Sequence, residues 1–279
     1  MARAETGADV EVVERATGST FGTPFDLNLI GLKTLVQKEI RRFLKVPGQT
    51  LAAPVVTTLM FMAIFSLALG RAGRTIEGVP FLEFLAPGLV MMAIIQNAFA
   101  NTSSSLLIAK IQGNIVDVLM PPLRPAELMF GLLAGGVARG LLVAVVVILV
   151  MIPIVGFHPA APLLIVFHAL AGSLMLALLG LLGALWAEKF DQMAAVTNFV
   201  ITPLSFLSGT FYSIGQLPAL FQALAHVNPF FYLIDGIRYG FTGFADSSLW
   251  LGAAVVATTD AALWILTHRL LARGYKIKN

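Results

Sequence analysis

The sequence predicts an all-α polytopic membrane protein, and its charge distribution is the first reason. No Asp, Glu, Lys or Arg occurs over the 48 residues 140–187, a run broken only once, at Gly156-Phe157-His158-Pro159. Such a run has room for two bilayer crossings of about 20 apolar residues each. The whole chain of 279 residues agrees, since 58% of it is hydrophobic and only 12% is charged. The apolar runs lack strand alternation and have helical length, so they are expected to satisfy their backbone as helices.

Six apolar stretches are long enough to cross a membrane, five of them clear and one weaker. They are Thr50–Leu69, Phe84–Ile108, Leu128–Val155, Pro162–Trp186, Ala194–Tyr212 and Leu249–Leu266. Residues 1–28 are polar with mixed charge and are expected to be a disordered cytoplasmic tail. Residues 29–279 are expected to form a single six-span transmembrane domain.

An amphipathic helix is expected over residues 29–46, ahead of the first span. Its apolar stripe is Leu29, Leu32, Val36, Ile40 and Phe43, and four basic residues lie mostly off the stripe. This pattern suits a helix at the cytoplasmic membrane interface. Two interpretations stay open: an orientation anchor, or a lever that contacts a cytoplasmic partner.

Residues 213–247 are expected to form a hairpin of two short helices. Asn228-Pro229 ends the first helix, because proline lacks a backbone donor and restricts the residue before it. With six spans, 14 basic residues lie on one side of the membrane, and only Arg71, Arg74 and Arg238 lie on the other. The positive-inside bias then places both chain ends in the cytoplasm. The hairpin is therefore expected to be re-entrant, on the outer side, between spans five and six.

Sequence signatures of catalysis are absent. The chain contains no G-x-x-x-x-G-K-[ST] loop for ATP, no H-E-x-x-H and no cysteine, and its four histidines share no ligand spacing. A non-catalytic chain without its own cofactor or metal site is therefore expected, and no nucleic-acid partner.

The loop between spans two and three, residues 110–127, has an amphipathic stretch, a proline turn and an acidic residue that opens the next helix. A stiff cytoplasmic elbow that transmits force and an ordinary tight turn explain this pattern equally well. The residues that give it this character are Asp117, Leu119, Pro121, Pro122, Leu123, Arg124, Pro125 and Glu127.

Charged, small and aromatic residues in or near the spans suggest further contacts. Arg139 and Asp260 lie within apolar helices, where a charge is unfavourable, and they are candidates for a pair; a locally solvated or protonated aspartate is the alternative. Asp235 and Arg238 are three apart and could pair on a helix. Two G-x-x-x-G patterns favour close helix approach, within the subunit or at a dimer seam. They begin at Gly131 and Gly136.

Aromatic residues crowd the outer half of the predicted fold. An interfacial belt is the default interpretation, and a platform for sugar rings or acyl chains is the alternative. The residues are Phe206, Phe211, Tyr212, Phe230, Phe231, Tyr232, Tyr239, Phe241 and Phe244.

Two blocks carry a family resemblance. The first is D-V-L-M-P-P-L-R-P-A-E at residues 117–127 with G-G-V-A-R-G-L-L at residues 135–142. The second is L-S-G-T-F-Y at residues 207–212, L-P at 217–218 and N-P-F-F-Y-L-I-D-G-I-R at 228–238. Together they resemble the permeases of type-2 ATP-binding-cassette exporters, in particular the polysaccharide, lipo-oligosaccharide and drug export branch. The resemblance covers about residues 25–270.

The resemblance implies a division of labour in the bacterial inner membrane. Two copies of the chain would form the path for an amphipathic or lipid-linked cargo, such as a glycan, a lipo-oligosaccharide or a drug. A separate cytoplasmic ATPase subunit would hold ATP and Mg and would receive residues 110–127 as a coupling helix. The hairpin would close the outer side of the path. The gate residues implied are Gly209, Phe211, Tyr212, Asn228, Pro229, Asp235 and Arg238.

Two other classes remain open. An ion-coupled secondary transporter would want more intramembrane ionisable groups than Arg139 and Asp260, and often an internal repeat. A non-transporting membrane scaffold would use residues 110–127 to recruit a cytoplasmic complex.

Overall fold

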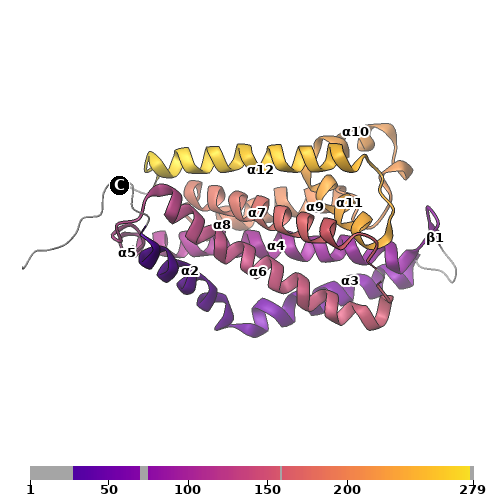
Figure 1. The fold of residues 1–279 in the computed structure, drawn as a ribbon, viewed down its shortest axis with the longest axis horizontal. Coiled ribbons are helices and arrows are strands. Elements are labelled where there is room, and N and C mark those ends of the chain that lie inside the picture. Colours follow the sequence, from indigo (N-terminus) through magenta and orange to yellow (C-terminus); the bar gives the residue numbers. More distant parts are fainter. Residues whose placement is uncertain (1–27, 70–74, 158, 277–279) are drawn as a thin grey trace, which may run out of the picture.

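The structure is a computed structural model that describes residues 28–69, 75–157 and 159–276. It is an elongated bundle of helices with one two-stranded hairpin (Figure 1). The predicted tail and the basic residues Arg3, Arg15, Arg71, Arg74 and Lys278 lie outside the described residues. The elements are α2 (Leu29–Leu44), η1 (Gly48–Ala52), α3 (Ala53–Leu69), β1 (Thr75–Ile76), β2 (Val79–Pro80), α4 (Phe81–Ile111), α5 (Ile115–Leu119), α6 (Pro125–Val155), α7 (Pro162–Trp186), α8 (Phe190–Val196), η2 (Thr197–Ile201), α9 (Thr202–Leu207), η3 (Ile214–Gln216), α10 (Ala219–Val227), α11 (Pro229–Thr242) and α12 (Leu249–Ala272).

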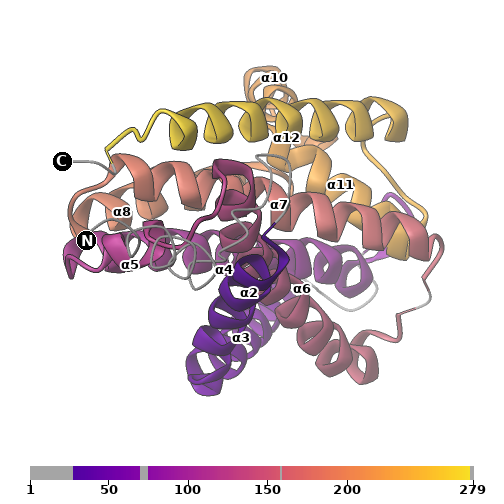
Figure 2. The same ribbon diagram turned by 60° about the vertical axis from the view of Figure 1, so that its left-hand side comes forward.

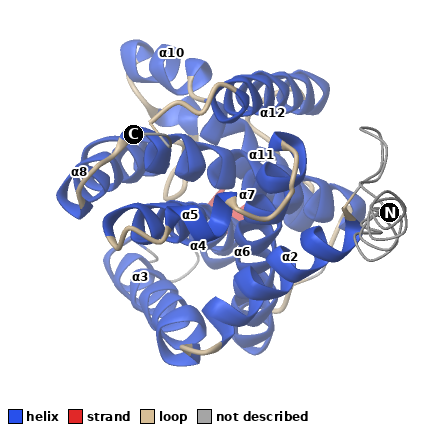
Figure 3. Ribbon diagram, turned by 90° about the vertical axis from the view of Figure 1, so that its left-hand side faces the viewer, coloured by secondary structure: helices blue, strands red, loops and turns tan. Residues whose placement is uncertain are grey.

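The predicted all-α polytopic membrane fold is confirmed. Five helices in the described part of the chain are long and apolar enough to span a bilayer: Gly48–Ala68, which joins η1 to α3, and α4, α6, α7 and α12. The five helices differ in burial over an apolar 18-residue stretch of each. In α4, 83% of that stretch is buried inside the protein, whereas in Gly48–Ala68 only 11% is buried. Seen from one end, α4 and α7 lie in the middle, with α3, α8 and α12 around them (Figure 3). The core is therefore built on α4.

The bundle has two chemically distinct ends. One end, here called the elbow end, carries α5 and the C-terminal end of α12, and the other, the hairpin end, carries β1, α10 and α11 (Figure 1). Lysines fix the elbow end, because Lys110 Nζ donates to the carbonyls of Ala184, Leu185 and Ala187 at 2.7–3.0 Å. Lys276 Nζ donates to the Trp186 carbonyl at 3.2 Å. The two lysines thus satisfy carbonyls that the end of α7 leaves without helical partners.

The fifth predicted span, Ala194–Tyr212, begins and ends earlier than expected. Its place is taken by α8, η2 and α9, which follow one another without a break from Phe190 to Leu207. This segment leaves the elbow end after α7 and reaches the hairpin end (Figure 1). It is not among the five candidate spans, so the count of six stays a prediction.

The hairpin between residues 213 and 247 contains the two helices that were predicted, α10 and α11. Asn228-Pro229 separates them, as expected, and the Asn228 Oδ1 accepts from Phe230 N at 3.1 Å. The re-entrant position of the hairpin within the membrane stays a prediction.

The G-x-x-x-G glycines allow helices to touch within the subunit. A Cβ at Gly131 would meet the Leu35 side chain of α2, and one at Gly135 would lie 2.6 Å from Glu39 Cβ. On the other face of α6, a Cβ at Gly136 would lie 2.8 Å from Thr102 Cγ2 of α4. Figure 2 shows α2 beside α6 at one edge of the molecule. Packing within the subunit is therefore confirmed as the use of both motifs.

Candidate functional site

The elbow, residues 110–127, presents an apolar surface at the end of the bundle. Val118 is buried and anchors α5 in the core, whereas Val116 is 55% exposed and Met120 is 74% exposed. Asp117, Pro121, Pro122 and Pro125 are exposed as well, and Leu123 and Arg124 are half-buried. The Leu119 side chain lies outside the described part of the structure. Large apolar side chains left exposed beside rigid prolines suit a protein contact.

Two residues far apart in the chain tie the elbow to α2. Glu127 is buried, and its carboxylate accepts from Arg124 N at 2.8 Å and from Asn28 N at 2.9 Å. Asn28 Oδ1 in turn caps α2 by accepting from Gly31 N at 2.8 Å. A Cβ at Gly31 would lie 3.0 Å from Leu123 Cδ2, so the helix start touches the proline turn. The amphipathic helix and the elbow are thus one connected unit, a contact that the sequence did not reveal.

The buried face of α2 differs from the predicted stripe. Leu35, Glu39 and Phe43 are buried, whereas Leu29 is 65% exposed and the helix ends at Leu44 rather than at residue 46. Glu39 enters this face because it has partners: Ser105 Oγ donates to it at 2.8 Å and Arg42 pairs with it at 3.3 Å. The four-residue spacing of positions 35, 39 and 43 is the sequence signal for this face.

Arg42 continues this polar junction into α4. One Nη donates to the Asn101 carbonyl at 2.7 Å and to Asn101 Oδ1 at 3.1 Å, and the other donates to Ser104 Oγ at 3.1 Å. Polar groups of α2 and α4 therefore meet beside the closely packed Gly135 of α6.

The proposed pair of Arg139 with Asp260 is wrong. Arg139 donates to Asn97 Oδ1 of α4 at 3.1 Å instead. Asp260 is 9% exposed on α12, and within the described residues its Oδ1 has no hydrogen-bond partner. The prediction failed because helical position says how deep a charge lies but not which neighbouring helix it faces.

The hairpin network also differs from the predicted pair of Asp235 and Arg238. Arg238 is fully buried and pairs with Asp246 at 3.7 Å, while Asp235 accepts from the backbone N–H groups of Asp246 and Ser247 at 2.7 and 2.9 Å. Arg238 also donates to the carbonyls of Phe84 and Gly209 and lies 3.9 Å above the centre of the Phe84 ring. One guanidinium thus joins α11 to the start of α4 and to the turn after α9.

The other predicted gate residues join the same end. Asn228 Nδ2 donates to the Leu204 carbonyl at 2.9 Å and to Ser208 Oγ at 2.8 Å, which ties the hairpin turn to α9. Tyr212 donates its hydroxyl to the Phe206 carbonyl at 3.1 Å. Gly209 has φ +74°, a conformation that favours glycine. Pro229 opens α11.

The predicted aromatic belt is wrong for most of its members. Phe211, Phe230, Phe231, Tyr232 and Phe241 are buried in the protein rather than turned outward. Three of the nine residues, Phe206, Phe211 and Tyr212, line a cleft of about 520 Å³ together with Phe65. Phe211 stacks on Phe65 with ring centres 4.1 Å apart and on Phe206 at 5.2 Å.

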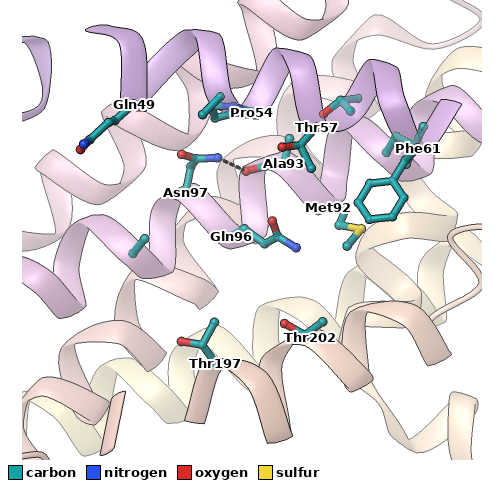
Figure 4. Close-up of a pocket in the computed structure, with 14 residues that line it drawn as sticks. Gln49, Pro54, Thr57, Phe61, Met92, Ala93, Gln96, Asn97, Thr197 and Thr202 are labelled. Atoms are coloured by element: carbon teal, nitrogen blue, oxygen red, sulfur yellow. Dashed lines mark hydrogen bonds between the residues drawn. The ribbon is translucent and has the colours of Figure 1, made fainter. Parts of the chain in front are cut away.

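This cleft is the hairpin-side member of a row of three neighbouring clefts, here called the groove, which lie along α3, α4 and the segment α8–η2–α9. A central cleft of about 360 Å³ lies next to it, and Phe61, which lines the central cleft, has its ring centre 6.0 Å from that of Phe211. An elbow-side cleft of about 220 Å³ shares Gln96, Ala100 and Thr197 with the central one. Figure 4 shows Gln96, Thr197 and Thr202 around the central cleft.

The groove changes character along its length. Its central wall carries amides and hydroxyls, whereas its hairpin-side wall is aromatic and aliphatic. Among the described residues, no charged side chain lines any of the three clefts. These residues were not predicted from the sequence, although amides and hydroxyls inside apolar spans are a usable signal. The central polar lining is Gln49, Thr57, Thr58, Gln96, Asn97, Thr197 and Thr202.

Titratable groups at the elbow end form an exposed pair. Lys276 Nζ donates to Glu188 Oε1 at 3.0 Å, and this hydrogen bond lowers the pKa of Glu188 and raises the pKa of Lys276. Both side chains are well exposed, so the pair adds little stability. Within the residues that the structure describes, no group of three His, Asp or Glu side chains could hold a metal ion.

Comparison with known proteins identifies the family of the chain. Residues 31–242 match the family described as ABC-2 type transporter. The chain is 36% identical to the inner membrane transport permease YadH of Escherichia coli K12. This match extends over 250 residues and covers 90% of this chain and 98% of the relative. It is also 30% identical to nodulation protein J of Sinorhizobium fredii, over 67% of this chain and 71% of the relative. Nodulation protein J of Rhizobium leguminosarum bv. viciae is 26% identical over 80% and 85% of the two chains.

Proposed function

The chain belongs to the ABC-2 type transporter family, as the transmembrane subunit of an ABC exporter, and we propose that a separate ATPase subunit drives it through the elbow. This proposal rests on one observation, that the elbow is both exposed and firmly attached. Val116 and Met120 are exposed, while Glu127 and Val118 hold the segment against the bundle. A surface that binds a motor must be exposed, and a surface that transmits motion must also be rigidly attached. The elbow meets both conditions.

Motion at the elbow has a direct route into the bundle. The elbow follows α4, the most buried of the candidate spans, and leads into α6, while Glu127 links it to α2. We therefore expect a push on α5 to move α2, α4 and α6 together. Binding of cargo must differ between the two transport states for this motion to do work.

The groove is the proposed cargo path. Amides and hydroxyls in its centre suit a polar group, and the aromatic cleft near the hairpin suits an apolar chain. This supports an amphipathic or lipid-linked cargo, such as a glycan, a lipo-oligosaccharide or a drug, moved out of the cytoplasm or the inner leaflet. The network around Arg238 would hold the hairpin as the outer gate.

A second copy of the chain is proposed to close the groove. The helices beside it expose apolar side chains, with Leu67 of α3 at 87% and Phe199 of η2 at 81% exposure. Homodimers usually bring the same surface of each copy together. We also propose that the segment α8–η2–α9 is the fifth of six membrane crossings. Six crossings of the bacterial inner membrane would leave both chain ends in the cytoplasm.

Cross-linking tests the elbow assignment with little background, because the chain has no cysteine. In the full chain produced with its ATPase partner, a single cysteine at Met120 or Val116 is expected to cross-link to the ATPase. The control is a cysteine at Leu67, which lies near the other end of the bundle and is more exposed than either test position. Cross-linking from Leu67 but not from Met120 or Val116 would contradict the assignment.

A further inference from the structure

Arg139 of α6 has an incomplete set of partners. One Nη donates to Asn97 Oδ1, but Nε is covered by protein and has no acceptor within the described residues. The three ion pairs found in the described ranges join Arg42 to Glu39, Arg238 to Asp246 and Lys276 to Glu188. A cation in an apolar span is unfavourable unless an anion or a wet cavity compensates it. The structure describes no anion that does so.

Within the described residues, the neighbouring polar junction also leaves buried polar atoms without hydrogen-bond partners, among them Glu39 Oε2, which pairs with Arg42 at 3.3 Å only as an ion pair. Arg42 Nε and Asn101 Nδ2 are also covered and without an acceptor, although Asn101 is fully buried. Arg42 lies near enough to Arg139 for the two positive charges to repel each other. Glu39 offsets one of these two charges, so the junction of α2, α4 and α6 keeps one positive charge in excess.

This excess charge lies directly behind the wall of the groove. Asn97, which accepts from Arg139, lines the central cleft, and Ser104, which accepts from Arg42, lines the elbow-side cleft. The cleft wall itself is neutral, and the amide of Gln96 also faces the cleft (Figure 4). Since a low-dielectric surrounding screens charge weakly, a bound group in the cleft would feel the guanidinium behind Asn97.

We propose that the central cleft binds the phosphate-type head group of a singly charged anionic amphiphile, with Arg139 as its counter-charge. Several acceptor oxygens on one group suit the amides and hydroxyls of the wall, and one negative charge balances the excess. The apolar tail then lies toward the aromatic cleft of Phe65 and Phe211. This inference rests on the proposed function of the groove as the cargo path, and it names the chemical class of the cargo.

The depth of the junction agrees with such a head group. Counting from Phe81 at the hairpin end, about 20 helical residues cross a hydrocarbon core of about 30 Å, which brings α4 close to Asn101. A hydrocarbon core that begins at Phe81 would place the junction near its boundary on the elbow side. Lys33, Lys38 and Arg41 are exposed on α2 nearby, and basic helices of this kind attract anionic lipid surfaces.

Binding can be measured with amphiphiles that share a 12-carbon tail. The full chain in dodecyl maltoside micelles is titrated at about pH 5, where a phosphate monoester with its second pKa near 6 carries one negative charge. The ligands are dodecyl phosphate, dodecyltrimethylammonium and inorganic phosphate, and the unfolding midpoint and binding curve are recorded. We expect dodecyl phosphate to raise the midpoint, and neither the cation nor inorganic phosphate to do so at equal concentration. Equal effects of dodecyl phosphate and the cation would overturn the proposal, and equal binding of inorganic phosphate would overturn the amphiphile as its source.

Variants identify the counter-charge. Arg139→Gln is expected to weaken dodecyl phosphate binding about tenfold, the change that corresponds to about 1.4 kcal/mol, whereas Arg139→Lys should keep much of it. Asn97→Asp places a carboxylate beside Arg139. It should therefore raise the unfolding midpoint of the unliganded protein and abolish the rise that dodecyl phosphate causes. This variant tests the counter-charge even if Arg139→Gln fails to fold. Lys38→Gln removes an equal charge from the surface of α2 and should leave the response intact. Undiminished binding by Arg139→Gln and Asn97→Asp would refute the assignment. The measurement uses no ATPase, so a failed elbow assignment would not affect it.

Discussion

The carboxylate of Glu127 accepts a hydrogen bond from the backbone N–H of Asn28, 99 positions earlier in the chain, at 2.9 Å. Through this contact the start of the amphipathic helix α2 is fastened to the first turn of α6, directly after the proline turn. The same carboxylate caps α6 through Arg124 N. We interpret the pair as the joint that makes α2 and the elbow move as one body.

Removal of this joint should weaken coupling more than folding. In Glu127→Ala, Asn28 N and Arg124 N lose their acceptor, so α2 should separate from the elbow while the core around α4 stays packed. We expect the ATPase activity of the complex to persist and transport per ATP to fall several-fold, as measured in proteoliposomes. Glu188→Gln is the control, because it removes an exposed carboxylate at the same end. An unchanged transport-to-ATP ratio in Glu127→Ala would refute the role of the joint.

Flexibility in the proline turn should have a related effect by a different cause. Replacing Pro121-Pro122-Leu123 by glycines leaves the surface of α5 in place but lets it move without moving α6. We predict ATP hydrolysis without transport and an unfolding midpoint close to that of the parent protein. Glu77→Gly is a suitable control, since Glu77 has φ +50° at the hairpin end and glycine accepts that conformation easily. Normal coupled transport by the glycine variant would count against the elbow.

Arg238 should be a major determinant of stability at the hairpin end. Arg238→Leu leaves the carboxylate of Asp246 without its partner, and loss of one member of a buried pair typically destabilises by about 3–5 kcal/mol. Arg238→Lys should also be destabilising, because an ammonium cannot reach the carbonyls of Phe84 and Gly209 and Asp246 together. Denaturant unfolding in mixed micelles measures both, with the exposed Arg273 changed to Gln as control. A stability loss no larger than that of the control would show that the network is unimportant.

The contact of α4 with α7 depends on a glycine that leaves no room for a side chain. A Cβ at Gly180 would lie 2.6 Å from the Phe99 carbonyl oxygen and would also meet Thr102 Oγ1. Gly180→Ala should therefore separate the two central helices and lower the free energy of unfolding by about 1–3 kcal/mol. At Gly48 a Cβ would meet nothing within 4 Å, so Gly48→Ala is the matched control. Equal stability of the two variants would contradict the close packing.

The sequence was a good guide to the spans and a poor guide to their neighbours. Long apolar runs are set by bilayer thickness, so the first four spans and the last could be located from residue type alone. The partners of Arg139, Asp260 and Arg238 depend on which helix faces which, and each was predicted from residues nearby in sequence or from charge alone. Asp246, the partner of Arg238, lies in a loop that no periodicity marks.

The groove was missed for a similar reason. The walls of its central cleft come from three segments, around residues 49–61, 89–100 and 197–202, and none of them has a motif of its own. Only the folded chain brings their amides and hydroxyls together. The elbow could be delimited from the sequence, by contrast, because its prolines and its acidic cap are contiguous, and its coupling role stays a proposal. Its tie to Asn28 could not be predicted, because Glu127 lies 99 positions later in the chain.

Reconstitution tests the central claim that this chain is a membrane path without a motor of its own. The full chain is placed in proteoliposomes alone or with the ATPase that co-purifies with it, and ATP-dependent movement of a panel of fluorescent amphiphiles is recorded. We predict movement only when both subunits are present, and its loss in the glycine variant of the elbow. Movement against a gradient by the chain alone with ATP, or ion-driven movement that needs no ATPase, would contradict the account.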